Sequence, residues 1–531
     1  MKTCKRQFLV LFLLILGLLL TAAGCSSTGG RAVDSDVQSV YTATTLGRVQ
    51  GLEQDGVSVY KGIPYAKPPV GSLRFLAPEP AEPWSDTLDC TEFGSSALQP
   101  TADDIPTPDE DCLNLNVWTS AQEGEKQPVY VFIHGGAYFQ GSGAKSMYDC
   151  TNFAKDGVVG VTINYRLGAL GFLGLEASKA EDGTTGNFGT LDQIQALKWV
   201  KENISAFGGD PENITVGGES AGSFSVSALI MSPLAKGLFN QAIMESGCIL
   251  DASAVSPYSG GDASASAAVS GAFARSFGAD DSLEGLNRLR QIDGHALTAM
   301  SQFNMDMTLP NALSFWPVND GVVLPVDPQK ALANGDYNPV RLLVGNNRDE
   351  GLIFIPDGLE AGDYAAYAYR ILGAEAAEQA LARWPVDAEH TASDRARQLL
   401  TLAGFRLGAT TFADTLSQNG HPVYYYEFNY STPDNPAAYH ASELPLVFGN
   451  ELDSLKLDKA GKQTAVDMHT AWVNFIKTGD PNQGTALASG VVWAPYTSQS
   501  KRVMMIDDQW SSNEMSQTDD LDFLRKTVYG K

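Results

Sequence analysis

The chain has 531 residues, of which 44% are hydrophobic and 18% charged, and its formal net charge at pH 7 is −26. This is the composition of a globular protein with a large core. A surface this acidic repels phosphate backbones, which argues against nucleic-acid binding. We attribute the acidity to solubility rather than to electrostatic steering of a ligand.

The N-terminus has the pattern of an export signal. Three basic residues precede an apolar run over 8–20, which has signal-peptide length but is short for a membrane span. Small residues then lead into Cys25, as at a bacterial lipoprotein processing site, although Ala22 stands where such sites more often have leucine. We expect a signal peptide over 1–24, a lipidated Cys25 and a flexible tether over 25–41, which anchor the exported protein to the membrane of the cell envelope. The alternatives are plain secretion and an uncleaved anchor.

No linker or internal repeat divides the chain after about residue 42, and we predict a single domain over 42–531. The Ala-, Ser- and Gly-rich stretch 251–272 comes nearest to a linker, and we interpret it as a surface connection.

The rest of the chain alternates between strand and helix patterns. Helical patterns cover 187–207 and 220–232. Short β-branched or apolar runs predict buried strands at 129–133, 158–164, 214–216, 242–245, 340–344 and 423–428. This alternation predicts a mainly parallel sheet with helices on both faces. In such sheets a ligand site lies beyond the carboxyl ends of the strands.

The first predicted strand, 129–133, runs into His-Gly-Gly-Ala-Tyr at 134–138. A glycine-rich turn after a strand exposes backbone N–H groups at short range, as an oxyanion site requires. The alternative interpretation is an ordinary tight turn.

The most informative motif is Gly-Glu-Ser-Ala-Gly at 218–222, directly after the predicted strand 214–216. A serine hydroxyl is a weak nucleophile, and a sharp turn from strand to helix presents its Oγ where a base can reach it. Ser220 is therefore the candidate nucleophile, and Ala221 adds an N–H group at the start of the helix. Five residues are a weak signal alone, so the assignment depends on its context.

A base and an acid follow two other predicted strands. Of the six histidines, His440 lies in the loop beyond the carboxyl end of 423–428, where the base of a catalytic triad belongs. A packed loop histidine is the alternative. The adjacent carboxylates Asp349 and Glu350 follow the strand 340–344, and their spacing does not choose between them.

These motifs closely resemble those of the type-B carboxylesterases, the branch of the α/β-hydrolases that contains para-nitrobenzyl esterases and cholinesterases. The matching runs span most of the mature chain. They are Gly-Ile-Pro-Tyr-Ala at 62–66, Leu-Arg-Phe at 73–75, Glu-Asp-Cys-Leu-Asn-Leu-Asn-Val at 110–117, His-Gly-Gly-Ala at 134–137, Asn-Tyr-Arg-Leu-Gly at 164–168, Phe-Gly-Gly-Asp-Pro at 207–211, the serine motif, Asp-Glu-Gly at 349–351 and His-Ala-Ser-Glu-Leu at 440–444.

The resemblance implies an α/β-hydrolase fold, with a large, mixed and mostly parallel central sheet between helices. It also implies hydrolysis of small carboxylic esters through an acyl-enzyme. The implied site consists of the triad Ser220, His440 and Glu350 and of the oxyanion-binding N–H groups of Gly136, Ala137 and Ala221. The alternative function is a catalytically inactive binding or adhesion module on the same fold.

The cysteines depart from the family pattern. The family's first loop cysteine usually lies where this chain has Ala97, so Cys90, seven residues earlier, is the candidate disulfide partner of Cys112. Cys150 and Cys248 are predicted to be buried thiols. No cysteine pair has zinc-ligand spacing, and we expect neither a metal nor a cofactor.

The loop over 99–110 contains no aromatic residue. Cholinesterases place a cation-binding tryptophan in the corresponding loop, and a quaternary ammonium group needs an aromatic face. Choline esters are therefore not the expected substrates.

Overall fold

The computed structural model describes residues 37–530 apart from 252–262, 302–304, 310–314 and 433–435. The predicted signal peptide over 1–24 and Cys25 lie outside these residues. The unit that the structure describes begins at Val37, and the first strand, β1, starts at Gln38. The prediction of a tether up to residue 41 was therefore wrong at its end, because these last residues pair with the next strand.

Within the described residues, thirteen strands form one sheet. Twelve of them follow the spatial order β1-β2-β3-β7-β9-β8-β10-β11-β12-β13-β14-β15, and β4 pairs with β2. The strands are β1 (Gln38–Ala43), β2 (Arg48–Gln54), β3 (Val57–Pro64), β4 (Leu88–Asp89), β7 (Asn114–Thr119), β8 (Gln127–Ile133), β9 (Val159–Ile163), β10 (Gly209–Glu219), β11 (Gln241–Glu245), β12 (Arg341–Asn347), β13 (Val423–Phe428), β14 (Arg502–Ile506) and β15 (Ser511–Glu514). The run from β9 to β14 is parallel, and antiparallel strands flank it.

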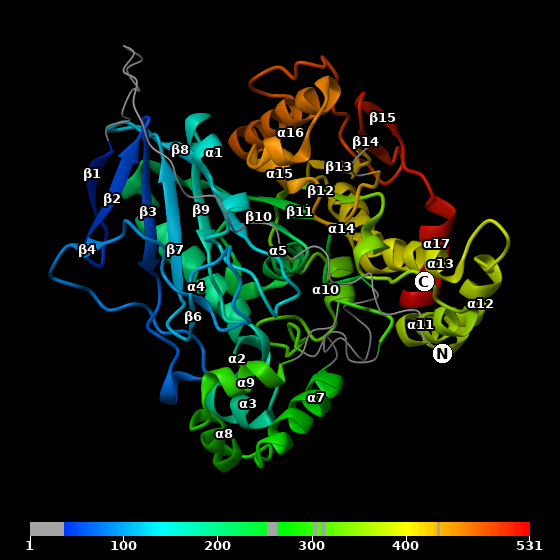
Figure 1. The fold of residues 1–531 in the computed structure, drawn as a ribbon, viewed down its shortest axis with the longest axis horizontal. Helices are drawn as coiled ribbons and strands as arrows, with labels where there is room; N and C mark the ends of the chain where they lie inside the picture. The colour runs from blue at the N-terminus through cyan, green and yellow to red at the C-terminus, as the bar shows by residue number, and fades with distance from the viewer. Residues whose placement is uncertain (1–36, 252–262, 302–304, 310–314, 433–435, 531) are drawn as a thin grey trace, which may run out of the picture. The chain divides into compact units, whose positions relative to one another are not determined.

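Helices cover the sheet and its edges (Figure 1). They are α1 (Thr151–Lys155), α2 (Gly168–Phe172), α3 (Glu176–Asp182), α4 (Phe188–Asn203), α5 (Ala221–Met231), α7 (Ala263–Ser276), α8 (Leu283–Arg290), α9 (Gly294–Met300), α10 (Pro328–Asn334), α11 (Ala361–Leu372), α12 (Ala374–Arg383), α13 (Ala392–Thr401), α14 (Leu407–Gln418), α15 (Leu444–Phe448), α16 (Lys459–Thr478) and α17 (Thr518–Tyr529). No helix among the described residues is both long enough and apolar enough to span a bilayer.

The alternation of side chains along β8 shows how the core is divided. Val129 and Val131 belong to one buried cluster, which includes residues of α4 and α5, whereas Tyr130 and Phe132 belong to a second cluster with Trp472 of α16. Successive side chains of a strand point to opposite faces, so both faces of the sheet are buried under helices. Figure 1 shows α16 on one side of the central strands and α4 and α5 on the other. The predicted α/β architecture is confirmed.

The stretch 251–272 was only partly predicted correctly. Residues 252–262 lie outside the described part, but α7 begins at Ala263 and buries Phe273 and Ala274 in the core. Alanine is the strongest helix former, so an Ala-rich segment with an apolar face folds as a helix and not as a surface connection.

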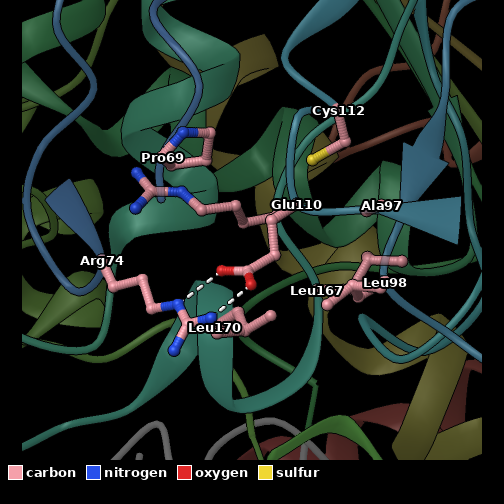
Figure 2. Close-up of a pocket in the computed structure, with 9 residues that line it drawn as sticks. Pro69, Arg74, Ala97, Leu98, Glu110, Cys112, Leu167 and Leu170 are labelled. Atoms are coloured by element: carbon pink, nitrogen blue, oxygen red, sulfur yellow. Dashed lines mark hydrogen bonds and ion pairs between the residues drawn. The ribbon is translucent and has the colours of Figure 1, made fainter. Parts of the chain in front are cut away.

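The predicted disulfide between Cys90 and Cys112 is not formed in the structure, where both are free and buried thiols. The backbone of Cys90 is fixed by hydrogen bonds to Gln50 and Lys61 of β2 and β3. The Cys112 side chain instead lines a small cavity beside the ion pair of Arg74 and Glu110 (Figure 2). The two thiols thus have different surroundings. Cys150 and Cys248 are free and buried, as predicted.

Candidate active site

Ser220 occupies a strained turn between β10 and α5. Its φ and ψ are 57° and −125°, a region that non-glycine residues rarely adopt. The flanking glycines make the turn sterically possible. A Cβ atom on Gly222 would lie 2.0 Å from the Ile133 carbonyl oxygen, and one on Gly218 would lie 2.5 Å from the backbone of Gly222. The turn therefore requires the glycines of the sequence motif.

The glycine-rich run after β8 forms a second tight turn beside the serine. Gly136 has a φ of +106°, and a Cβ atom there would lie 2.1 Å from the Gln140 carbonyl oxygen. Ala137 also has a positive φ, 56°. The N–H groups of Gly136, Ala137 and Ala221 form no hydrogen bond to another described residue. All three residues line the same cavity as Ser220, so these donors are available to a ligand.

His440 lies in the loop after β13, against the carboxyl end of β12. Its Nδ1 is 2.6 Å from Glu350 Oε2. Glu350 is fully buried, and its other oxygen accepts a hydrogen bond of 2.7 Å from the Asn347 N–H group. One edge of the imidazole ring is thus held by a carboxylate that is itself fixed by the backbone of β12.

Asp349, the other acidic candidate, has a different role. Its Oδ2 accepts hydrogen bonds from the Arg348 guanidinium at 2.8 and 3.0 Å and from the Ala438 N–H group at 3.0 Å. Its side chain therefore supports the loop that carries His440, without contacting the imidazole. Of the two adjacent carboxylates, the structure places Glu350 on the histidine.

Glu219, which precedes the serine, is a residue that the sequence analysis did not single out. It is buried, and its Oε1 lies 3.1 Å from His440 Nε2, the ring nitrogen not used by Glu350. His440 Nε2 makes no hydrogen bond to another described residue, and it lines the same cavity as Ser220. Catalytic hydrogen bonds are often long when no substrate is bound.

The carboxylates around His440 control its charge. Burial lowers the pKa of the imidazole, but the charges of Glu219 and Glu350 outweigh burial and raise the pKa to about 9. Burial also raises the pKa of the Glu219 carboxyl above its ordinary value. The imidazole therefore holds a proton more strongly here than in water.

The cavity has a volume of about 210 Å³ and brings together Ser220, His440 and the three N–H donors. Its remaining lining is largely apolar and aromatic. The lining residues are Gly136, Ala137, Gln140, Tyr148, Glu219, Ser220, Ala221, Phe224, Met305, Met307, Trp316, Ile353, Phe354, Phe405, His440 and Ala441. Within the described part of the chain, no group of three or more His, Cys, Asp or Glu side chains is placed to hold a metal ion.

Two aromatic rings against His440 were also missed from the sequence. The ring centroids of Phe354 and Phe405 lie 5.0 and 4.8 Å from that of His440. Phe405 belongs to a π-helical turn, Leu402–Arg406, at the start of α14. Such turns are rare and are common at functional sites. A short apolar run in the sequence does not indicate a π-helical turn, so the contact between Phe405 and His440 could not be predicted.

Comparison of the sequence with known proteins finds one family model and several similar hydrolases. A model of the family described as "Carboxylesterase family" matches residues 36–524. The para-nitrobenzyl esterase of Bacillus subtilis (strain 168) is 39% identical over 488 residues, which cover 88% of this chain and 94% of the relative. The phenmedipham hydrolase of Pseudarthrobacter oxydans is 33% identical over 507 residues, which cover 88% and 94% of the two chains.

The same similarity is found among solved structures. A PNB esterase structure superposes with a TM-score of 0.80 at 37% sequence identity, and the match covers 91% of this chain and 99% of that chain. A carboxylesterase of Geobacillus stearothermophilus superposes with a TM-score of 0.78 at 34% identity, over 91% of this chain and 99% of that chain.

Proposed function

The chain belongs to the carboxylesterase family, and from this premise we propose that it hydrolyses carboxylic esters through an acyl-enzyme on Ser220. His440 is the proposed general base and acid, and Glu350 orients its ring. The observation that carries the proposal is the convergence of a strained serine, an imidazole held by a buried carboxylate, and three unpaired N–H groups on one cavity.

In the proposed acylation step, His440 Nε2 takes the Ser220 hydroxyl proton as Oγ attacks the ester carbonyl carbon. The bond between that carbon and the alcohol oxygen then breaks, and His440 gives its proton to the departing alcohol. Glu350 stabilises the imidazolium that forms between the two transfers and keeps Nδ1 as the protonated nitrogen. The product of this step is an ester between the acyl group and Ser220.

The N–H groups of Gly136, Ala137 and Ala221 are the proposed oxyanion hole. Negative charge develops on the carbonyl oxygen as the tetrahedral intermediate forms, and fixed backbone donors stabilise it without reorganising. The positive φ values at Gly136 and Ala137 turn successive N–H groups in this region of the backbone away from regular hydrogen bonding.

In the proposed deacylation step, a water molecule attacks the acyl carbon while His440 takes one of its protons. The intermediate then releases Ser220 Oγ, which regains its proton from His440, and the carboxylic acid leaves. The free serine is thereby regenerated, and the reaction requires only the ester and water.

The lining of the cavity favours uncharged esters. Among the described residues that line it, none is a lysine or an arginine. An anionic ester would lose its hydration there without gaining a lysine or an arginine as its partner. An inactive binding module is not favoured, because the serine, the histidine and the glutamate are all present.

The proposal is tested by hydrolysis and by labelling of the nucleophile. We expect the purified protein without residues 1–24 to hydrolyse p-nitrophenyl acetate and to lose this activity when treated with a fluorophosphonate. Mass spectrometry of the digested protein should find the phosphonyl group on Ser220, with fluoride as the leaving group. Labelling at another residue, or inactivation without labelling, would contradict the assignment.

Glu219→Gln is expected to move the acid limb of the pH profile of kcat/KM to lower pH. The base must be neutral, so kcat/KM falls as the pH drops through the pKa of His440. The Glu219 charge raises that pKa, and an uncharged amide of similar size removes this contribution. The measurement is kcat/KM for p-nitrophenyl acetate between pH 5 and 10. Glu212→Gln is the control, because its side chain is 80% exposed and forms an ion pair with Lys201 on the surface, away from His440. An unchanged limb, or one at higher pH, would contradict the prediction.

A further inference from the structure

Four aromatic residues of the cavity form two separate groups, whereas a fifth, Tyr148, packs on Phe132 and Phe448. Phe354 and Phe405 pack against His440. Phe224 pairs edge to face with Trp316 at a centroid distance of 4.9 Å. Among the described residues, no ring pair joins one group to the other. The cavity therefore has one aromatic wall at the histidine and another at the beginning of α5.

The chemistry of the proposed reaction assigns a part of the ester to each wall. The alcohol oxygen must lie within hydrogen-bond reach of His440 Nε2 to be protonated, and the carbonyl oxygen must face the oxyanion donors. The acyl carbon chain is the remaining substituent of the tetrahedral carbon, and it is directed away from the histidine. Phe224 lies one helical turn beyond Ser220, since its N–H group donates to the Ser220 carbonyl oxygen at 2.9 Å. The wall of Phe224 and Trp316 thus faces the acyl side.

This wall cannot move aside easily. A Cβ atom on Gly247 would lie 2.6 Å from the Phe224 ring, so backbone supports the ring from behind. Trp316 packs edge to face on Tyr138 at 4.9 Å, and Ser225 of α5 donates a hydrogen bond to the Tyr138 hydroxyl. Phe224 and Trp316 are only 3% and 4% exposed. A longer acyl chain would therefore meet a packed wall rather than solvent.

The histidine side of the cavity is more open. Ile353, next to Phe354, is 41% exposed, and Met305 is 44% exposed, although both line the cavity. The segment of Met305 and Met307 is joined to this side because the Met307 N–H group donates to the Phe354 carbonyl oxygen at 3.0 Å. A large alcohol group can extend over these apolar side chains toward solvent, and methionine adapts to varied shapes.

We infer that the substrates are esters of short-chain acids with bulky apolar alcohols, and that Phe224 sets the limit on acyl length. This inference rests on the proposed function, because it needs Ser220 and His440 to define the acyl and alcohol sides. Phe224 acts by occupying space that the end of a longer acyl chain would need.

The test is acyl-chain selectivity. For the wild-type protein, we expect kcat/KM to be higher for p-nitrophenyl acetate and butyrate than for the octanoate. Phe224→Ala should raise the ratio of kcat/KM for octanoate over acetate at least about tenfold, the lower range of discrimination for a single methylene in an apolar pocket. Phe224→Leu, which disturbs the core less, should shift the ratio in the same direction by a smaller factor. Selectivity among acetates of different alcohols should stay unchanged.

Phe273→Ala is the matched control, because Phe273 is equally a buried phenylalanine but packs on Phe277 and Phe315 rather than in the cavity. A rise of the ratio in both Phe224 variants and not in the control supports the inference. An equal ratio in Phe224→Leu and the wild type, or a wild type that prefers octanoate, overturns it while ester hydrolysis itself stands. A wild type that hydrolyses none of the esters overturns the proposed function and this inference with it.

Discussion

Replacing Ser220 by alanine is expected to lower kcat/KM for p-nitrophenyl acetate on the order of 10⁴-fold or more, which is the usual effect of removing a triad nucleophile. Alanine keeps the Cβ atom, so the positive φ of this position costs the same before and after the change. The Ser220 N–H group would still donate to the Glu245 carbonyl oxygen. The melting temperature should therefore change little while the activity is lost.

The chain offers a closely matched control for this variant. Ser246 directly follows β11, the strand beside β10, and its φ is also 57°. It is buried and does not line the cavity. Ser246→Ala is thus the same substitution in the same type of backbone, and it should retain activity within about tenfold. Equal losses in the two variants would mean that a structural disturbance, not the missing Ser220 hydroxyl, explains the result.

The second large effect is expected at the adjacent carboxylates. Glu350→Gln should reduce kcat by about 10⁴-fold, since an amide in this position no longer stabilises the imidazolium and can favour the wrong tautomer. Asp349→Asn should reduce kcat by less than about tenfold, because this side chain only supports the histidine loop through the Ala438 N–H group. The measurements are kcat and KM near the pH optimum, together with the melting temperature of both variants.

The pair forms its own control, because each variant changes one carboxylate to its amide at neighbouring positions. The reverse order of effects would transfer the role of the acid to Asp349. Equal and large losses would indicate that the position of His440 depends as much on its loop as on the carboxylate that contacts it.

Much of the central sheet could be predicted from the sequence. The run 423–428 coincides with β13, and 129–133 lies within β8, because strands buried on both faces appear as continuous apolar segments. The strand β10 is longer than the predicted 214–216. It continues to Glu219 because Gly217, Gly218 and Glu219 pair with β11, and it begins at Gly209, whose pairing with Gln127 is separated from the rest of the ladder by a register shift. The antiparallel strand β1 was not predicted, because its exposed face breaks the hydrophobic run.

Two residues of the candidate site could be proposed from their positions along the chain. His440 could be chosen because it comes after a strand, and Ser220 because its turn requires glycines. The contact of Glu219 with the imidazole could not be found in this way, since it depends on burial beside a loop more than 200 residues away in the sequence. Phe405 was missed for a similar reason, because tertiary packing of a π-helical turn decides where its ring lies.

The order of the strands determines how the position of His440 relative to Ser220 can be altered. Three steps of the ladder separate β10 from β13, and at about 4.8 Å per step the two strand ends are about 14 Å apart. No side chain spans this gap, so the loop after β13 must carry His440 back across β11 and β12. The residues just before His440 are held by hydrogen bonds between Asp349 and Ala438 and from the Asn347 side chain to the Tyr439 carbonyl oxygen. The nucleophile is thus fixed to the sheet, whereas the approach of the base can be adjusted by substitutions outside the cavity, which gives evolution a way to alter rate without rebuilding the nucleophile.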